Sequence, residues 1–144
     1  MDTSTVQFFP SDSFVSGTCL QHQGVEMSYS DLCLMFGKPF YEGIGDKITT
    51  EFSIEYRWYD AEWDEHKTGV FTIYDWHFAR NLNDDYAKTA WNIGGTNIDD
   101  YFAFVEAREL FEKHSSECEM YTNPFKDGLL LNTVHDLPEV GVTC

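Results

Sequence analysis

The fold of this chain is decided by a stretch in which apolar and polar side chains alternate, KITTEFSIEYRW, residues 47–58. Apolar side chains stand at positions 48, 52, 54, 56 and 58, and polar ones at 49, 51, 53, 55 and 57. Because successive side chains of a strand point to opposite faces of a sheet, this period of two predicts a β-strand with one buried face. A second stretch, VFTIYDWHF at 70–78, predicts another strand. Together they predict an antiparallel hairpin whose loop is the charged segment 60–67.

Two helices are expected on either side of this hairpin. Ser28 before an apolar segment that closes at Gly37 predicts a short helix over 29–36. Thr96 or Asn97 is the expected cap of a longer helix over 97–114, with acidic residues in its first turn that suit the helix dipole.

Weaker signals complete the expected sheet. A short strand is expected within residues 15–27, with a turn near Gly24, and another at 90–93, ended by Gly94 and Gly95. Residues 79–88 are expected to be an exposed loop. The sequence therefore predicts one α+β domain over residues 1–144, with an antiparallel sheet of three to five strands packed by one long and one short helix. Residues 1–14 are expected to be partly disordered and 115–144 to form an irregular extension.

The charge of the chain limits its partners. The 144 residues include 25 acidic and nine basic side chains, a formal net charge of −16. Phosphate groups and anionic lipid headgroups are bound through Lys and Arg, so neither nucleic acid nor a membrane surface is an expected partner. Aromatic residues make up 17% of the chain, which predicts a folded acidic domain because acidic disordered chains are poor in aromatic residues. A basic protein is the partner that this charge favours.

Location follows from similar arguments. No apolar run approaches the ~20 residues that span a bilayer, and the first ten residues lack the basic and apolar regions of a secretory signal. We therefore expect a soluble protein of the cytoplasm. The four cysteines, Cys19, Cys33, Cys118 and Cys144, form no metal-binding pattern and are expected to be free thiols, with Cys33 in the core.

Three constellations resemble sites of chemistry and fall short of them. The acidic segment from Asp60 to His66 lacks the Gly and the distal Glu of a calcium loop. The turn at 94–97 is not a phosphate-binding motif, and the carboxylates that follow it would repel phosphate. Asp75 and His77 share one strand face but have no nucleophile in a recognised motif. We expect no catalytic residue, metal or cofactor.

Four blocks of sequence resemble a family of small proteins of bacteriophages and large DNA viruses that has no settled activity. The blocks are LMFGKP at 34–39, GDKITTE at 45–51, TIYDW at 72–76 and WNIGG at 91–95, within a likeness that spans about residues 28–112. The acidic loop 60–67 and the extension beyond 114 depart from the family, so no functional residue is transferred from it. The resemblance implies a viral origin more than a function. With a viral origin, the expected cytoplasm is that of the host cell.

Acidity and viral origin together predict a non-enzymatic inhibitor that resembles DNA in charge and binds a basic host protein, of the anti-CRISPR or anti-restriction type. The expected contacts are the carboxylates of three clusters: Asp60, Glu62, Asp64, Glu65, Asp84, Asp85, Asp99 and Asp100. A first alternative is a sponge for a nucleotide signal, with a pocket made by Arg57, Trp58, Trp76, Trp91 and Arg108. A second is a structural or assembly protein of a virion. The leading hypothesis depends on whether the three acidic clusters share one face.

Overall fold

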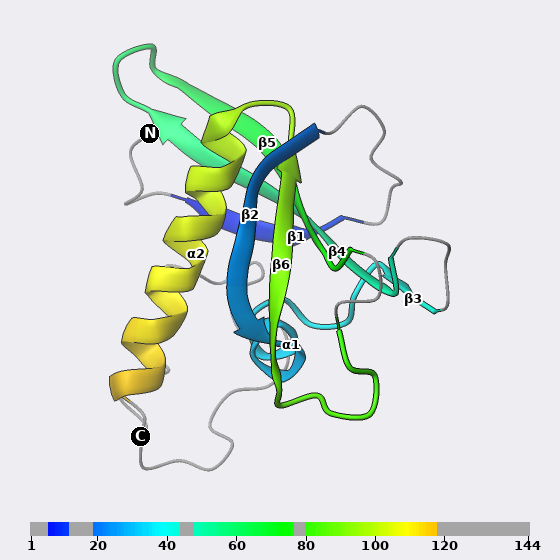
Figure 1. The fold of residues 1–144 in the computed structure, drawn as a ribbon. Coiled ribbons are helices and arrows are strands. Elements are labelled where there is room, and N and C mark those ends of the chain that lie inside the picture. The colour runs from blue at the N-terminus through cyan, green and yellow to red at the C-terminus, as the bar shows by residue number, and fades with distance from the viewer. Residues whose placement is uncertain (1–5, 12–18, 44–47, 77–79, 118–144) are drawn as a thin grey trace.

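The alternating stretch forms a long strand of a six-stranded antiparallel sheet in the computed structural model, which describes residues 6–11, 19–43, 48–76 and 80–117 (Figure 1). The strands are β1 (Gln7–Pro10), β2 (Cys19–Ser28), β3 (Tyr41–Glu42), β4 (Thr50–Asp60), β5 (Glu65–Tyr74) and β6 (Lys88–Gly95). The helices are α1 (Tyr29–Phe36) and α2 (Ile98–Glu117). The expected α+β class is confirmed, but the sheet has more strands than the three to five predicted.

The additional strands are short and occupy one edge of the sheet. Its order is β1-β4-β5-β6-β2, and β3 pairs with β4 off this path. β1 pairs with β4 from Gln7↔Arg57 to Pro10↔Ile54, and β3 pairs with β4 from Tyr41↔Glu51 to Glu42↔Thr50. Segments of four and two residues are too short to show a period of two, so the sequence pattern missed them.

The hairpin differs from its prediction in where the strands end. β4 and β5 stay paired as far as Asp60↔Glu65, so the turn is only residues 61–64 and not the whole of 60–67. β5 also begins and ends earlier than the predicted 70–78. The sequence predicts a loop for these charged residues because both faces of the hairpin are largely solvated there, and a strand without a buried face has no apolar alternation.

The edge strand β2 is a single strand of ten residues and not a short strand with a turn. Gly24 has a φ of +79°, and it lies within a shift of register between His22 and Val25. This shift inserts one extra residue into β2, and the bend there needs a left-handed backbone that glycine adopts without strain. Gly24 therefore marks a bulge in a continuous strand.

Both helices agree with their predicted positions. The Ser28 hydroxyl accepts a hydrogen bond from the Asp31 backbone N–H at 3.0 Å and caps α1, and Gly37 ends it with a φ of 78°. α2 starts one residue later than predicted and continues to Glu117. Neither described helix is long and apolar enough to cross a membrane.

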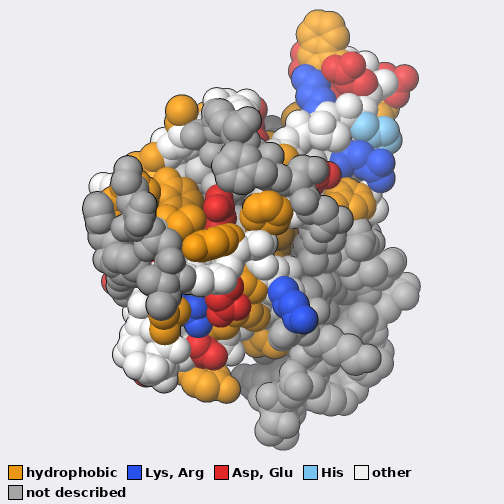
Figure 2. Space-filling model, turned by 90° about the vertical axis from the view of Figure 1, so that its right-hand side faces the viewer, with side chains coloured by type: hydrophobic (Ala, Val, Ile, Leu, Met, Phe, Trp, Pro, Cys, Tyr) orange, Lys and Arg blue, Asp and Glu red, His pale blue; other side chains and the backbone are white. Residues whose placement is uncertain are grey.

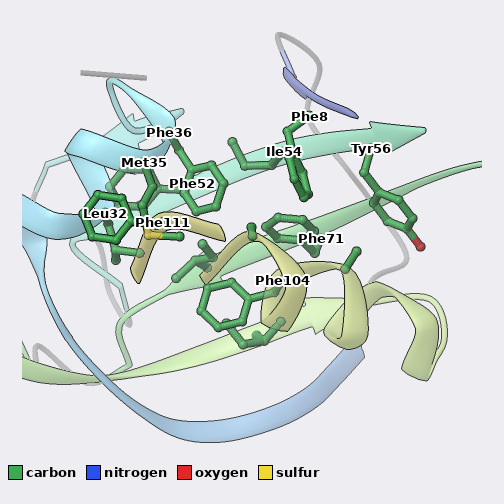
Figure 3. Close-up of a cluster of buried hydrophobic side chains, with 14 of the residues drawn as sticks. Phe8, Leu32, Met35, Phe36, Phe52, Ile54, Tyr56, Phe71, Phe104 and Phe111 are labelled. Atoms are coloured by element: carbon green, nitrogen blue, oxygen red, sulfur yellow. The ribbon is translucent and has the colours of Figure 1, made fainter. Parts of the chain in front are cut away.

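The core lies between the helices and one face of the sheet, as Figure 3 shows. Phe71 of β5 is at its centre, with ring centroids 6.3 Å from Phe8 of β1, 5.8 Å from Phe36 of α1 and 5.9 Å from Phe104 of α2. These rings meet mostly edge to face, the arrangement that aromatic quadrupoles favour. A single core thus holds both helices to the sheet, and the hairpin extends from it.

Some predicted features lie outside the described residues. They are His77, Cys118, Cys144, the residues of segments 1–14 and 115–144 that fall outside 6–11 and 115–117, and part of the GDKITTE block. Cys33 is partly buried against the core, and Cys19 is an exposed free thiol.

Candidate functional site: an acidic hairpin arm

The β4–β5 hairpin extends beyond the strands on either side of it. The pairing of β1 with β4 ends at Arg57, and β6 pairs with β5 only between Thr72 and Tyr74. Residues 58–67, here called the arm, therefore have no strand partner outside the hairpin among the described residues. At ~3.3 Å per residue, the arm extends roughly 10 Å past Arg57. Figure 2 shows it standing clear of the molecule, with hydrophobic, acidic and basic side chains on its surface.

The turn at the end of the arm is fixed by two aspartates. Asp60 accepts hydrogen bonds at Oδ1 from the backbone N–H groups of Glu62 at 3.0 Å and Trp63 at 3.4 Å. Asp64 has a left-handed backbone with a φ of 50°, and its carboxylate accepts the Tyr59 hydroxyl proton in a hydrogen bond. Asp tolerates this conformation and bonds to nearby backbone groups better than most residues. The aspartates of this segment thus shape the turn.

Cross-strand contacts stiffen the arm. Lys67 Nζ lies 3.1 Å from Asp60 Oδ2 and 5.8 Å from the centre of the Trp58 ring. The rings of Tyr59 and His66 are 5.4 Å apart. An isolated two-stranded hairpin is marginal in water, so these contacts on both faces give the arm one defined shape.

The ion pair also fixes the charges within the arm. The hydrogen bond to Asp60 raises the pKa of Lys67 above its usual range. Partial desolvation pushes the pKa of Asp60 upward, but the Lys67 ammonium and the backbone N–H groups of Trp63 and Glu62 outweigh it, and the pKa is lowered. Asp60 is therefore charged and already engaged, with a side chain only 13% exposed.

What the arm presents to solvent is an indole among carboxylates. Trp63 is 68% exposed, and Glu62, Asp64 and Glu65 are exposed around it. Lys67 is the one Lys or Arg of the arm. Of the four acidic residues predicted here, three face solvent and Asp60 serves mainly as a structural residue.

The two aspartates predicted at the start of α2 have different surroundings. Asp99 is exposed, whereas Asp100 is only 1% exposed. Asp100 Oδ1 accepts the Tyr56 hydroxyl proton in a hydrogen bond of 2.5 Å, and Oδ2 accepts from the backbone N–H of Thr96 at 2.7 Å and of Asn97 at 3.4 Å. Asp100 thus caps the helix and holds it to β4. Burial, and then the hydrogen bond to Asp100, raise the pKa of Tyr56.

The third cluster lies at the other end of the sheet. Asp84 Oδ1 accepts from the backbone N–H groups of Tyr86 and Ala87 at 3.0 and 3.1 Å, and Asp85 lies 2.8 Å from Arg80. This loop follows the end of β5 that is opposite to the arm, about 30 Å away at the usual rise of a strand. The three acidic clusters therefore do not gather at one end of the molecule. The arm and the start of α2 lie toward one end of the molecule, and residues 84–85 lie at the other (Figure 1).

Arg80 is a residue whose role the sequence did not indicate. Its side chain is 3% exposed, its guanidinium carbon lies 3.5 Å from the centre of the Tyr29 ring, and NH1 donates to Thr50 Oγ1 at 2.7 Å. Beneath it, the buried carboxylate of Asp75 accepts from the backbone N–H of Thr50 at 2.9 Å. An arginine in a polar segment reads as exposed, so no sequence signal pointed to this burial. These contacts hold β4, α1 and the 80s loop together.

The residues predicted for a nucleotide pocket are not brought together. Trp91 is fully buried and donates its indole N–H to the Met27 carbonyl at 2.9 Å. Arg57 on β4 donates to Gln7 Oε1 on the neighbouring strand β1, while Arg108 on α2 pairs with Glu112 at 3.1 Å. Trp58 lies in the arm, and Trp76 is 41% exposed beside Tyr74. No cleft among the described residues is lined by these five side chains together, so no observation supports the nucleotide pocket.

No group of three His, Cys, Asp or Glu side chains converges as a metal site within the described ranges.

Comparison of the chain with protein-family models, with curated proteins and with solved structures found no match. The likeness to a viral family therefore stays a prediction.

Proposed function

We propose that this chain is a non-enzymatic inhibitor of viral origin that binds a basic, nucleic-acid-processing host protein through its acidic arm. The observation that supports this proposal most is the arm itself: a stiffened projection with exposed carboxylates at Glu62, Asp64 and Glu65, on a chain whose net charge is −16. A projection of this kind can enter a groove that a flat acidic surface cannot enter.

Electrostatics account for the approach of the two proteins. The net negative charge attracts a basic surface over a distance of several ångströms and raises the rate of association, and salt screens this attraction with a Debye length of about 8 Å at physiological ionic strength. Basic grooves that hold nucleic acid are the surfaces of strongest complementary charge. The arm would then compete with the phosphates for the same Lys and Arg side chains.

The proposed contact set is smaller than the sequence suggested. It keeps Glu62, Asp64, Glu65 and Asp99, which are exposed toward one end of the molecule. It leaves out Asp60 and Asp100, which are largely removed from solvent and accept hydrogen bonds within the chain, and residues 84–85, which lie at the other end. The proposal is therefore local competition by a projecting arm and not imitation of a long stretch of duplex.

The experiment is capture of proteins from bacterial lysate on the immobilised chain at low salt, with and without added duplex DNA. We expect the retained proteins to be basic and nucleic-acid-binding, to be released by DNA, and to be lost at high salt. A captured complex that resists both DNA and salt would contradict the proposal. If the protein is instead found in purified virus particles, the structural alternative is favoured.

Two matched variants separate the arm from general charge. Glu62→Gln with Glu65→Gln removes two charges from the arm, and Glu26→Gln with Glu109→Gln removes two from exposed positions on β2 and α2. We expect the arm variant to lose capture and the control to retain it. Equal loss in both would assign the binding to net charge alone.

A further inference from the structure

We propose that Trp63 is the anchor of the interface: it inserts into an apolar or aromatic pocket of the partner protein, and the carboxylates around it pair with Lys or Arg side chains on the rim of that pocket. This inference rests on the proposed function, because it takes the partner to be a basic protein. It adds the shape and chemistry of the contact, which charge alone does not specify.

Trp63 is the most exposed large hydrophobic side chain of the arm. It occupies the four-residue turn at the tip of the arm, where it is 68% exposed. The other aromatic side chains of the arm are engaged within it: Trp58 under Lys67, and Tyr59 with both Asp64 and His66. Among the described residues, none makes a ring contact with Trp63. Every aromatic residue of the arm except Trp63, at its tip, thus has a partner within the arm.

The turn that carries Trp63 is ordered by hydrogen bonds within the arm. The Trp63 backbone N–H donates to Asp60 Oδ1, and Asp60 is held in turn by Lys67. The backbone that carries the indole is therefore ordered before any partner arrives. A Trp side chain offers about 200 Å² of surface for burial and loses little conformational freedom on binding, which is why Trp is enriched among residues that dominate interfaces.

The carboxylates around Trp63 determine which kind of apolar surface can receive the indole. Glu62 and Asp64 flank the indole in the chain, and Glu65 follows. A pocket with a cationic rim satisfies both the indole and these carboxylates. An anionic lipid surface would repel them, and an apolar pocket without cations would desolvate them without compensation.

The test uses two soluble probes, poly-L-lysine and a random lysine–tyrosine copolymer with the same number of lysines. The chain is labelled with fluorotryptophan, so that fluorine NMR reports each of its four tryptophans separately. We expect the copolymer to bind about tenfold more tightly than poly-L-lysine, a factor that equals ~1.4 kcal/mol. We also expect its binding to shift the Trp63 resonance while that of Trp76, 41% exposed outside the arm, stays in place.

The variant Trp63→Ala supplies the matched comparison. Because this side chain is mostly exposed, the variant is expected to fold, which its remaining three fluorine resonances will show. It should bind both polymers with the affinity that the wild type has for poly-L-lysine. A tenfold preference that survives in this variant, or an unmoved Trp63 resonance, would overturn the anchor.

The other outcomes separate a failure of the proposed function from a failure of the anchor. If neither polymer binds, the proposed function fails; if both bind equally and Trp63 is unaffected, only the anchor fails. The last measurement replaces the polymers by vesicles of phosphatidylcholine. A shift of the Trp63 resonance on these vesicles as large as on the copolymer would assign the indole to a lipid surface and overturn the protein pocket.

Discussion

Replacing Asp100 by alanine tests how the start of α2 is held, and replacing Asp99 by alanine is its matched control. The two neighbours carry the same charge on the same helical turn, but only Asp100 is buried. Alanine at 100 removes hydrogen bonds to Tyr56, Thr96 and Asn97 and leaves the Tyr56 hydroxyl without its acceptor. A lost helix cap costs about 1 kcal/mol and a lost hydrogen bond to a charged group ~1.5–3 kcal/mol.

We therefore expect Asp100→Ala to lower the free energy of unfolding by about 2.5–4 kcal/mol, a large share of the 5–15 kcal/mol typical of a domain. Asp99→Ala loses only its interaction with the helix dipole, about 0.5 kcal/mol. Urea unfolding followed by far-UV circular dichroism measures both values. If the two variants lost the same stability, Asp100 would not be the tether described here, and both aspartates would be surface charges.

Three further predictions concern the arm, the phenols and the buried arginine. Lys67→Ala should leave the urea midpoint nearly unchanged but speed amide hydrogen exchange in the arm, and unchanged exchange would show that the arm is not held by this lysine. The raised pKa of Tyr56 favours its protonated form in the folded state, so the free energy of unfolding should be at its full value below about pH 10 and fall above it. In urea titrations at alkaline pH, the free energy of unfolding of Tyr56→Phe should fall less steeply with pH than that of the wild type. Equal slopes would contradict the raised pKa. Arg80→Met should lower the free energy of unfolding by about 2 kcal/mol. This is less than the usual loss on breaking a buried ion pair, because the Asp85 side chain is 51% exposed and regains water. Calorimetry that finds no loss of stability would contradict the structural role of Arg80.

The sequence predicted the parts of the fold that carry a period or a cap. The alternation around Phe52 located β4, and Ser28 with Gly37 located α1, because each of these signals arises within a few residues. β1 was missed because its partner on β4 lies some fifty residues away, and nothing within four residues indicates such a pairing.

The candidate site was predicted in composition but not in geometry. The sequence placed carboxylates at Asp60 and Asp100 but could not show that both accept hydrogen bonds from their own chain. Burial of Asp100 depends on Tyr56, 44 positions earlier, and on the close approach of Gly95, where a Cβ would lie 2.6 Å from that of Asp100. Trp63 was visible as a residue, but its isolation at the tip follows from the pairing of both strands up to the turn.

The most direct test of the arm as the binding element is a salt titration against the purified protein that the immobilised chain captures. The account predicts that Glu62→Gln with Glu65→Gln weakens binding about tenfold at low salt and flattens the dependence of log Kd on log salt concentration, while Glu26→Gln with Glu109→Gln leaves both nearly unchanged. Equal losses in the two variants, or an affinity that does not change with salt in the wild type, would contradict it.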